Sequence, residues 1–252
     1  MPLQFLEAHS PLSAILIEKS KYDGIWISSL THSAIRGLPD NELVSLKERV
    51  ELVEEIKKIT TKPILVDFDT GGQIEHLPYY IKWFEKVGTW GVIIEDKRFP
   101  KQNSLLAEGK HQLEEVDIFC QKIKIAKENT KEMKVFARLE SLIAQKSIYD
   151  ALIRTEAYIQ AGTDGILIHS KEKITANEVM GFAKEYKEKW KLPLIAIPST
   201  YELPKEHQFD IIIYANMMLR ASIKAMENVV NAKNPKDIEM VSVEDIFRLV
   251  GH

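Results

Sequence analysis

The chain has 252 residues, of which 45% are apolar and 28% are charged, with a formal net charge of −3 and a pI near 6.2. This mild acidity argues against a protein that binds nucleic acid or another polyanion. The single cysteine, Cys120, leaves no disulfide framework and no thiolate zinc site. The sequence shows no leader-like N-terminal segment and no apolar run near the roughly 20 residues of a membrane span. We expect a cytoplasmic protein with no nucleic-acid partner and no membrane partner.

Short apolar runs alternate with longer amphipathic segments from one end of the chain to the other. The short runs are rich in Val, Ile and Leu and continuously apolar, as buried parallel strands are. They predict strands at residues 5–7, 24–28, 64–67, 92–95, 135–138, 165–169, 194–197 and 211–214. The amphipathic segments predict helices at residues 10–20, 41–59, 76–87, 113–128, 148–161, 175–189 and 217–232.

Residues near the ends of these helices carry local signals. Asp40 and Thr175 are predicted N-caps, because their side-chain oxygens can accept hydrogen bonds from the first helical amides. Gly88 and Gly162 fall where a helix returns to a strand, a position that favours glycine. Pro78 lies in the first turn of its helix, where the missing N–H costs little. These signals support the alternation of strands and helices.

Strands joined by helical segments, with no polar linker between two halves, predict a single (β/α)8 TIM-type barrel domain over residues 1–252. A doubly wound open sheet is the alternative, because counting strands from one sequence leaves the topology open. Residues 243–249 predict an extra C-terminal helix after a polar loop around residues 234–236. This helix could cover the bottom of the barrel or pack on a neighbouring subunit.

Polar residues stand at the C-terminal ends of several predicted strands. In a barrel these ends converge on one mouth, where the following loops carry the active site. Buried strands that end in ionisable groups are costly unless those groups pair or bind an ion. The residues concerned are Ser28 and Ser29, Asp67 and Asp69, Glu95, Arg138 and Glu140, and His169 and Ser170.

Acidic residues predict a metal site in this mouth. Asp67, Asp69 and Glu95, with Asp40 on a preceding loop, supply four carboxylates without a thiolate or histidine cluster beside them. Oxygen ligands suit a hard cation such as Mg2+, which often contacts one or two carboxylates and keeps several waters. The alternative is that Asp67 and Asp69 only accept hydrogen bonds from turn amides. Glu95 at the next strand end favours the metal.

Cationic residues predict an anion site beside the metal. Arg138 ends a strand where its guanidinium can bind a carboxylate or phosphoryl group, and His169 ends the next strand in the same way. A lone strand-end histidine is more often structural, but here an arginine and acidic residues accompany it. Metal at one end and a cationic pair at the other indicate a phosphorylated keto acid as substrate.

Three further stretches have simpler interpretations. Residues 96–104 follow a buried strand and concentrate cations, an amide and a hydroxyl, which predicts a loop that closes over the substrate. Residues 47–58 alternate acidic and basic residues at helical spacing, which predicts a solvated helix face. Trp26 lies one residue from the mouth, and we expect it to pack in the core, with a wall of the substrate site as an additional role.

The loop at residues 95–105, with the sequence EDKRFPKQNSL, closely resembles the gating loop of the phosphoenolpyruvate mutase family in the isocitrate lyase superfamily. The similarity continues in order along nearly the whole chain, at residues 7–13, 28–31, 36–40, 67–72, 137–140, 168–171 and 214–216. The resemblance implies a Mg2+-dependent isomerase that interconverts phosphoenolpyruvate and phosphonopyruvate. That reaction forms the carbon–phosphorus bond of phosphonate biosynthesis.

The resemblance also implies a role for each residue that matches a family motif. At the metal, these residues are Asp67 as the direct ligand and Asp40, Asp69 and Glu95 around the metal's waters. At the keto acid, they are the Ser28 side chain and the backbone of Ser29 and Leu30, with Trp26 nearby. At the phosphoryl group, they are Arg138 and His169. On the closing loop, they are Lys101, Asn103 and Ser104.

Other activities share much of this pattern. A phosphonopyruvate hydrolase has the same fold and most of the site but replaces the loop asparagine, so Asn103 favours the mutase. Carbon–carbon lyases of the superfamily carry a catalytic cysteine in this loop, whereas Cys120 lies beyond it. A non-catalytic phosphate or keto-acid binder would need fewer of these residues. The resemblance further implies a homo-oligomer, a dimer or a tetramer, whose subunits exchange C-terminal helices.

Overall fold

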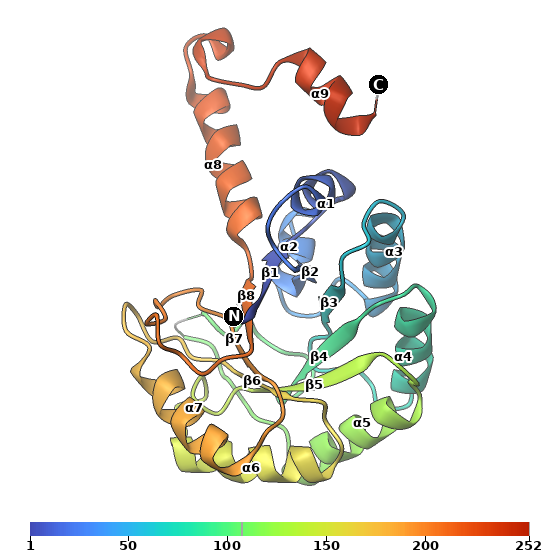
Figure 1. The fold of residues 1–252 in the computed structure, drawn as a ribbon, viewed down its shortest axis with the longest axis vertical. Helices are drawn as coiled ribbons and strands as arrows, with labels where there is room; N and C mark the ends of the chain where they lie inside the picture. Colours follow the sequence, from blue (N-terminus) through green and yellow to red (C-terminus); the bar gives the residue numbers. More distant parts are fainter. Residues whose placement is uncertain (107, 252) are drawn as a thin grey trace.

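The computed structural model describes residues 1–106 and 108–251. Within these residues, eight parallel strands form a closed barrel in chain order. The first strand, β1 (Leu3–Glu7), pairs with the last, β8 (Ile211–Tyr214), and so closes the sheet. Helices surround the strands (Figure 1). The predicted TIM-type barrel is confirmed, and the doubly wound open sheet is wrong.

The observed strands lie within two residues of their predicted bounds. The remaining strands are β2 (Gly24–Ile27), β3 (Ile64–Asp67), β4 (Gly91–Glu95), β5 (Lys134–Leu139), β6 (Ile166–Ile168) and β7 (Leu194–Ala196). The helices are α1 (Pro11–Glu18), α2 (Ser29–Ala34), α3 (Leu46–Lys57), α4 (Leu77–Lys86), α5 (Val116–Glu128), α6 (Ile148–Gln160), α7 (Asn177–Lys189), α8 (Met217–Asn231) and α9 (Val243–Val250). A short 3-10 turn, η1 (Pro235–Asp237), lies between α8 and α9, where a polar loop was expected.

Two apolar layers form the core, one inside the barrel and one between the strands and the helices. In β4, Ile93 belongs to the inner layer, whereas Val92 and Ile94 pack in the outer layer. This alternation follows from the period of two along a strand. Trp26 is 1% exposed and belongs to the inner layer, which confirms its expected packing in the core.

The two predicted N-caps are wrong. Helix α3 begins after Ser45, because Ser45 and Glu48 form a capping box in which each side chain binds the other residue's backbone N–H. Asp40 therefore lies in the preceding loop. Helix α7 begins two residues after Thr175, whose hydroxyl donates to Glu172 at 2.5 Å instead of capping the helix.

The other helix-end signals are confirmed. Gly88 and Gly162 follow α4 and α6 with φ angles of 83° and 101°, a region that glycine tolerates without a side-chain clash. Pro78 lies in the first turn of α4. The short helix α2 was not predicted. It follows β2 directly, and its N-cap is Ser28, which the sequence pattern assigned to the strand.

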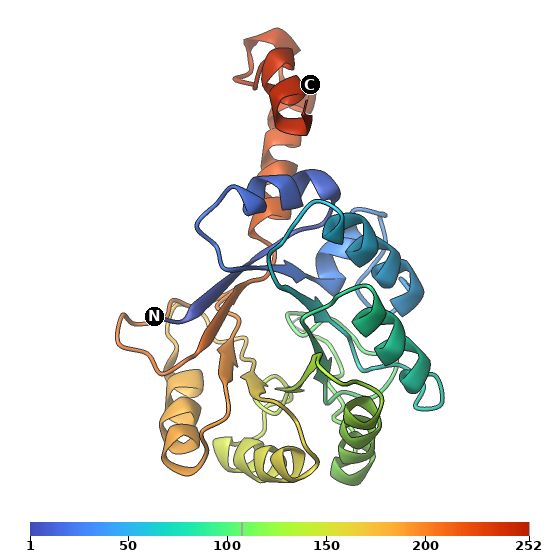
Figure 2. The same ribbon diagram turned by 45° about the vertical axis from the view of Figure 1, so that its right-hand side comes forward.

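The C-terminal arm, defined here as residues 217–251, leaves the barrel after β8 (Figures 1 and 2). Its root is fixed by the buried carboxylate of Glu7, which accepts a hydrogen bond from the Leu219 amide at 3.1 Å. Helix α9 matches the predicted C-terminal helix but lies beyond α8 and away from the barrel, so it does not cover the barrel bottom. Leu219 is the buried residue of α8, and α9 has none in the described chain.

The sequence predicts no membrane-spanning segment, and the helices of the structure can be compared with that prediction. Among residues 1–106 and 108–251, none of the helices combines the length and the apolar character that a bilayer crossing requires.

Gly165 offers a test of the close approach between neighbouring strands. A Cβ atom at Gly165 would lie 2.6 Å from the backbone oxygen of Pro193 and 3.0 Å from the Phe136 ring. We expect Gly165→Ala to lower the free energy of unfolding by ~1–3 kcal/mol, because a backbone oxygen must move. Chemical denaturation measures this change. As a control, Gly181→Ala in α7 meets only the tip of Ile148 and should leave stability unchanged or slightly higher. Equal effects of the two substitutions would contradict the prediction.

Candidate active site

The period of two along each strand directs polar side chains into the mouth of the barrel. In each of the strands β2 to β6, an inner-layer apolar residue is followed two positions later by a polar residue on the same face. The pairs are Trp26 and Ser28, Leu65 and Asp67, Ile93 and Glu95, Phe136 and Arg138, and Leu167 and His169. All five polar side chains are buried. Residues far apart in the sequence therefore share one enclosed polar site.

The ammonium group of Lys101 lies at the centre of the acidic half of this site. Lys101 Nζ is 2.7 Å from Asp69 Oδ1 and 3.4 Å from Asp40 Oδ2. The same nitrogen is 3.8 Å from Glu95 Oε1 and donates to Ser29 Oγ at 2.9 Å. Burial alone would lower the pKa of Lys101, but the surrounding carboxylates raise it well above its usual value. The loop lysine is therefore a charged counterion for the acidic residues.

Asp67 lies beside this acidic cluster and accepts hydrogen bonds from neutral donors. The Ser29 hydroxyl donates to Asp67 Oδ2 at 2.9 Å, and the Asp69 amide approaches Oδ1 at 3.2 Å. Arg138 Nη1 is 4.0 Å from Asp67 Oδ2. Asp67 therefore stands between the acidic half of the mouth and the half that contains Arg138.

Arg49 supports the acidic half from behind, and this residue was missed in the sequence. Its guanidinium donates to Asp69 Oδ2 at 2.7 Å and to the Asp67 carbonyl at 2.6 Å, and its side chain is buried. Burial alone would raise the pKa of Asp69, but Arg49 and Lys101 outweigh it and lower that pKa. The solvated face predicted for residues 47–58 is wrong at this position. The signal was the spacing, because Arg49 follows Leu46 by three residues on the apolar face of α3.

The other half of the mouth is a network around Glu140. Arg138 Nε donates to Glu140 Oε1 at 2.6 Å, and Arg138 Nη2 lies 2.7 Å from His169 Nδ1. Lys97 Nζ is 3.0 Å from Glu140 Oε2, to which the Ser104 hydroxyl donates at 2.5 Å. Two cationic side chains thus face one carboxylate, which favours an anion in this half of the site.

Protonation states in this network follow from burial and neighbouring charge. Burial alone would raise the pKa of Glu140, but Arg138 and Lys97 outweigh it and hold that pKa well below its usual value. Burial and the adjacent Arg138 lower the pKa of His169 to about 4, so its ring is neutral near pH 7. His169 can therefore donate or accept one hydrogen bond without adding charge.

The loop that follows β4 closes the mouth. The Asn103 side-chain amide donates to Asp40 Oδ2 at 2.6 Å, and Lys101 and Ser104 are each 4% exposed. The cavity at the mouth has a volume of about 40 Å³, far below the ~300–1,000 Å³ of typical ligand pockets. Its walls include Trp26, Ser28, Ser29, Leu30, Asp40, Asp67, Lys101, Asn103, Ser104, Arg138 and His169. The loop must therefore open before a substrate can enter.

Every residue predicted for the site lies in or directly beneath this cavity. Asp69 and Glu95 do not line it, but both contact Lys101, which does. Ser28 is the N-cap of α2, so Ser29 and Leu30 form the first turn of that helix at the edge of the cavity. The amides of a first helical turn are available to an anion.

The acidic half has the oxygen donors that a hard cation requires. In the described chain, Asp40 Oδ1 and both carboxylate oxygens of Glu95 are buried without a hydrogen-bond partner. Burial, offset in part by Lys101, raises the pKa of Glu95 to about 7. With Lys101 among the acids, no three Asp, Glu, His or Cys side chains of the described residues already surround one point as ligands. The donor set fits Mg2+, which needs one or two carboxylates, once the ammonium group moves away.

A second buried network supports the strand ends and was also missed in the sequence. Asp96 accepts a hydrogen bond from the Glu140 amide at 2.8 Å and from the Tyr158 hydroxyl at 2.8 Å, and lies 3.4 Å from Arg154. Burial raises the pKa of Asp96 to about 6. This network ties the start of the closing loop to β5 and α6. No sequence signal distinguished Asp96 from the neighbouring loop charges.

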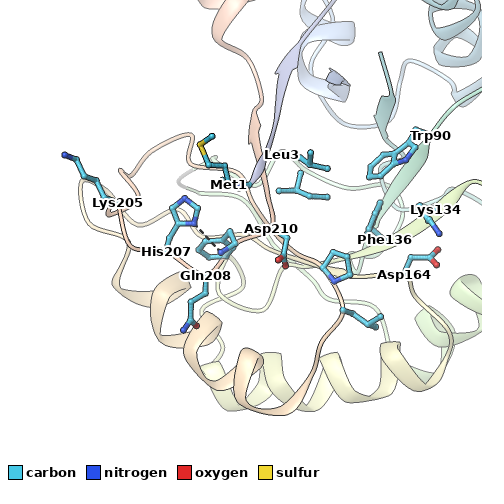
Figure 3. A pocket seen from close by; sticks show the side chains of 15 residues that line it. Met1, Leu3, Trp90, Lys134, Phe136, Asp164, Lys205, His207, Gln208 and Asp210 are labelled. Carbon is cyan, nitrogen blue, oxygen red and sulfur yellow. Dashed lines mark hydrogen bonds between the residues drawn. The ribbon is translucent and has the colours of Figure 1, made fainter. Parts of the chain in front are cut away.

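A second cavity lies at the opposite end of the barrel (Figure 3). It has a volume of about 950 Å³ and is lined by Trp90, Phe136 and the residues that begin several strands. Its acidic residues already bind backbone amides: Asp164 accepts from the Val135 amide at 2.7 Å, and Asp210 accepts from the Leu194 amide at 2.7 Å. These carboxylates hold strand ends together, as is typical of the N-terminal face of a barrel.

Comparison with known proteins identifies the family. The family model described as phosphoenolpyruvate phosphomutase matches residues 1–233. The phosphoenolpyruvate phosphomutase of Tetrahymena pyriformis is 37% identical over 261 residues, which cover 98% of this chain and 86% of that protein. The crystal structure of the Streptomyces platensis subsp. rosaceus phosphomutase has a TM-score of 0.92 and 33% identity, covering 100% of this chain and 91% of that one. A phosphonopyruvate hydrolase solved with oxalate and Mg2+ has a TM-score of 0.88 and 30% identity, and the match covers 99% of this chain and 90% of that one. The chain belongs to the phosphoenolpyruvate phosphomutase family.

Proposed function

We propose that this protein is a phosphoenolpyruvate mutase, an isomerase that interconverts phosphoenolpyruvate and phosphonopyruvate. In the direction of phosphonate formation, the phosphorus–oxygen bond breaks and a phosphorus–carbon bond forms, with no water consumed. The observation that carries the proposal is the position of Asn103. It lines the same cavity as Arg138 and His169, while its amide nitrogen reaches Asp40 at 2.6 Å. An amide there can follow a phosphoryl group between the two halves of the mouth.

The keto-acid end of the substrate fits the start of α2. The Ser28 side chain and the backbone N–H groups of Ser29 and Leu30 would bind the carboxylate and the enolate oxygen. Trp26, buried at 1% exposure, would form the floor beneath them. Donors aimed at a developing oxyanion typically contribute ~3 kcal/mol each to transition-state stabilisation. These residues would hold the enolate still while the phosphoryl group moves.

The phosphoryl end fits the network around Glu140. Arg138 and the neutral His169 would bind the phosphoryl oxygens, and Ser104 would add a hydroxyl donor from the loop. Phosphoryl transfer passes through a loose, metaphosphate-like transition state, so the protein chiefly positions the group and balances its charge. Glu140 would orient Arg138, whose Nε it binds at 2.6 Å.

The acidic half fits a bound Mg2+ ion. Asp67 would be the direct ligand, with Asp40, Asp69 and Glu95 around the metal's waters. Bound there, the ion would supply positive charge that stabilises the enolate and orients the substrate. Lys101 would leave the acidic cluster as the ion enters, because both cations need the same carboxylates.

Exclusion of water separates the mutase from a hydrolase with the same site. Lys101 and Ser104, each 4% exposed, leave little room for solvent when the loop is closed. Water in that space would capture the phosphoryl group and yield pyruvate and phosphate. Phosphonopyruvate hydrolysis is therefore the second candidate function, and Asn103 favours the mutase. A non-catalytic phosphate or keto-acid binder is the third candidate, against which the full set of site residues argues.

The activity is tested by phosphorus NMR of phosphonopyruvate mixed with the protein and Mg2+. We expect a phosphoenolpyruvate signal, because a closed loop keeps the phosphoryl group inside the site. Pyruvate and free phosphate would identify a hydrolase instead, and no turnover would favour a binder.

The role of Asn103 is tested by Asn103→Ala. We expect the rate of isomerisation to fall by about 100-fold, the usual effect of removing one catalytic donor. The matched control is Gln102→Ala, because the exposed Gln102 side chain faces away from the cavity and binds the Lys110 amide at 2.9 Å. Equal rates for Asn103→Ala and the unmodified protein would rule out this role.

The buried charge of Glu95 predicts a pH effect on stability in the presence of a chelator. Burial raises the pKa of Glu95 from its usual 4.5 to about 7, so the folded protein binds this proton more tightly than the unfolded chain does, and folding stability falls as the pH rises between these two values. As Glu95 ionises, the free energy of unfolding should fall by a value on the order of 3 kcal/mol, and Glu95→Gln should remove this fall. The variant should therefore be more stable than the unmodified protein at pH 8 but not at pH 4.5. Urea denaturation at both values measures the difference.

Added Mg2+ provides the counterpart of this experiment. It should raise the melting temperature of the unmodified protein more than that of Glu95→Gln, because a ligand stabilises the state that binds it. The control Glu51→Gln alters an exposed pair with Lys47 and should respond to Mg2+ and pH like the unmodified protein. For the pH experiment, a difference in stability between Glu95→Gln and the unmodified protein that is the same at pH 4.5 and pH 8 would contradict the prediction.

A second copy of the chain is the proposed partner of the C-terminal arm, in a homodimer or homotetramer. An eight-residue helix such as α9 is marginal in water unless it buries its apolar face. Yet Val243 and Ile246 on α9 are 59% and 47% exposed, and Val230 on α8 is 81% exposed. Exchange of arms between subunits would cover these side chains.

Sedimentation equilibrium tests the assembly. The unmodified protein should have the mass of a dimer or a tetramer, and Val243→Asp combined with Ile246→Asp should reduce that mass by burying charge in the contact. Glu244→Gln on the same helix is the control and should leave the mass unchanged. A monomeric unmodified protein would overturn the assembly without affecting the assignment of the active site.

A further inference from the structure

We propose that Glu42 is a positioning residue that latches the backbone of the closing loop to the neighbouring rim of the barrel mouth. Glu42 lies between α2 and α3, and its carboxylate joins the turn after β3 to the backbone of the loop after β4. The latch itself is a property of the fold. Its consequence for catalysis rests on the proposed function.

The Glu42 carboxylate uses one oxygen for each element. Oε1 accepts from the Thr70 hydroxyl at 2.7 Å and from the Thr70 amide at 3.2 Å. Oε2 accepts from the Lys101 amide at 2.7 Å. Glu42 is half-buried and has a φ of 64°, the left-handed region that costs energy for a residue with a side chain. The backbone thus adopts an unfavourable conformation at the residue that makes the bridge.

The Thr70 end of the bridge is fixed. Thr70 is fully buried, and its carbonyl accepts a hydrogen bond from Lys122 Nζ at 2.8 Å. Its hydroxyl also lies 3.3 Å from the Gly72 amide. Glu42 therefore ties the loop to a rigid anchor rather than to another mobile segment.

The loop's side-chain contacts cannot all persist when the site is loaded. Lys101 Nζ and the Asn103 amide contact Asp40 and other carboxylates of the proposed metal site, so a metal ion would compete with both. Ser104 contacts Glu140 and Arg138, where the phosphoryl group would bind. These contacts stabilise the closed loop, and contacts to ligands would replace them during turnover.

The contact from Glu42 differs because it uses the loop backbone. The Lys101 N–H binds Glu42 on the rim and is not needed by the metal or the substrate, so this bond can persist while the Lys101 side chain moves. Lys97 Nζ also binds a loop carbonyl, that of Gln102 at 2.9 Å, but from the base of the loop. Glu42 binds the loop backbone from the neighbouring rim, and it would keep the lid shut over a loaded site.

Hydrogen exchange followed by NMR tests the latch without substrate. In Glu42→Gln, the backbone strain is unchanged, but the side-chain amide cannot accept from both Thr70 and Lys101. We expect the Lys101 amide to exchange about tenfold faster, the usual consequence of losing a hydrogen bond to a charged group. Exchange in β3 and β4 and the melting temperature should not change. An unchanged Lys101 exchange rate would overturn the latch.

Two further variants separate the latch from a general structural role. Thr70→Val keeps the side-chain shape but removes the hydroxyl that anchors Oε1, so it should also speed exchange of the Lys101 amide, and by less. When Thr70→Val is combined with Glu42→Gln, the Lys101 amide should exchange little faster than in Glu42→Gln alone, because both substitutions break the same bridge. Thr70→Val also provides the test if Glu42→Gln fails to fold. Glu51→Gln on the exposed face of α3 is the control and should have no effect.

Phosphorus NMR with phosphonopyruvate and Mg2+ tests the consequence for catalysis. If the latch keeps water out, Glu42→Gln should release a larger share of pyruvate and phosphate relative to phosphoenolpyruvate, with a smaller effect on KM than on the rate of isomerisation. An unchanged product ratio would show that the latch does not act during turnover. Failure of the unmodified protein to form phosphoenolpyruvate would overturn the proposed function, while the exchange result would still decide the latch.

Discussion

Three buried carboxylates around one buried ammonium group govern the mouth of this barrel. Asp40, Asp69 and Glu95 lie within 4 Å of Lys101 Nζ, and each of the four side chains is less than 10% exposed. Carboxylates buried in this way must be neutralised, or they protonate or destabilise the fold. The structure meets this requirement with a lysine from a loop. The conformation of the loop is therefore coupled to the charge of the site.

This coupling explains how one loop can serve two states of the protein. With the loop closed, the cation of the acidic half is Lys101, and the cavity of about 40 Å³ is too small for a substrate. A divalent ion would satisfy the same carboxylates with two charges instead of one, and would free the lysine. Arg49 remains on the far side of Asp69 in either case, so that carboxylate stays ionised and oriented. The opposite half needs no exchange of cations, because Arg138 and Lys97 already neutralise Glu140.

The sequence predicted much of the site because the C-terminal ends of parallel strands converge on one mouth. Polar residues at the ends of continuously apolar runs identified Asp67, Glu95, Arg138 and His169 as residues of that mouth. The same reasoning missed Arg49, since charge alternation in α3 was taken for a solvated face. It also missed Glu42, which was assigned to a helix that begins only after Ser45. Both residues act through partners that are distant in sequence, Asp69 for Arg49 and the Lys101 amide for Glu42.

By itself, the sequence determined the barrel, the identity of the polar strand ends and the resemblance of the loop to a known family. Those features depend on local rules, namely short continuously apolar strands that end in polar residues and the amphipathic spacing of helices. Only the tertiary structure decided which charges neutralise one another. It also decided that the Lys101 ammonium group lies among the acidic residues instead of in solvent, and that the C-terminal arm leaves the barrel. Electrostatic pairing depends on distances between side chains from different elements, and these distances are set by the closure of the barrel.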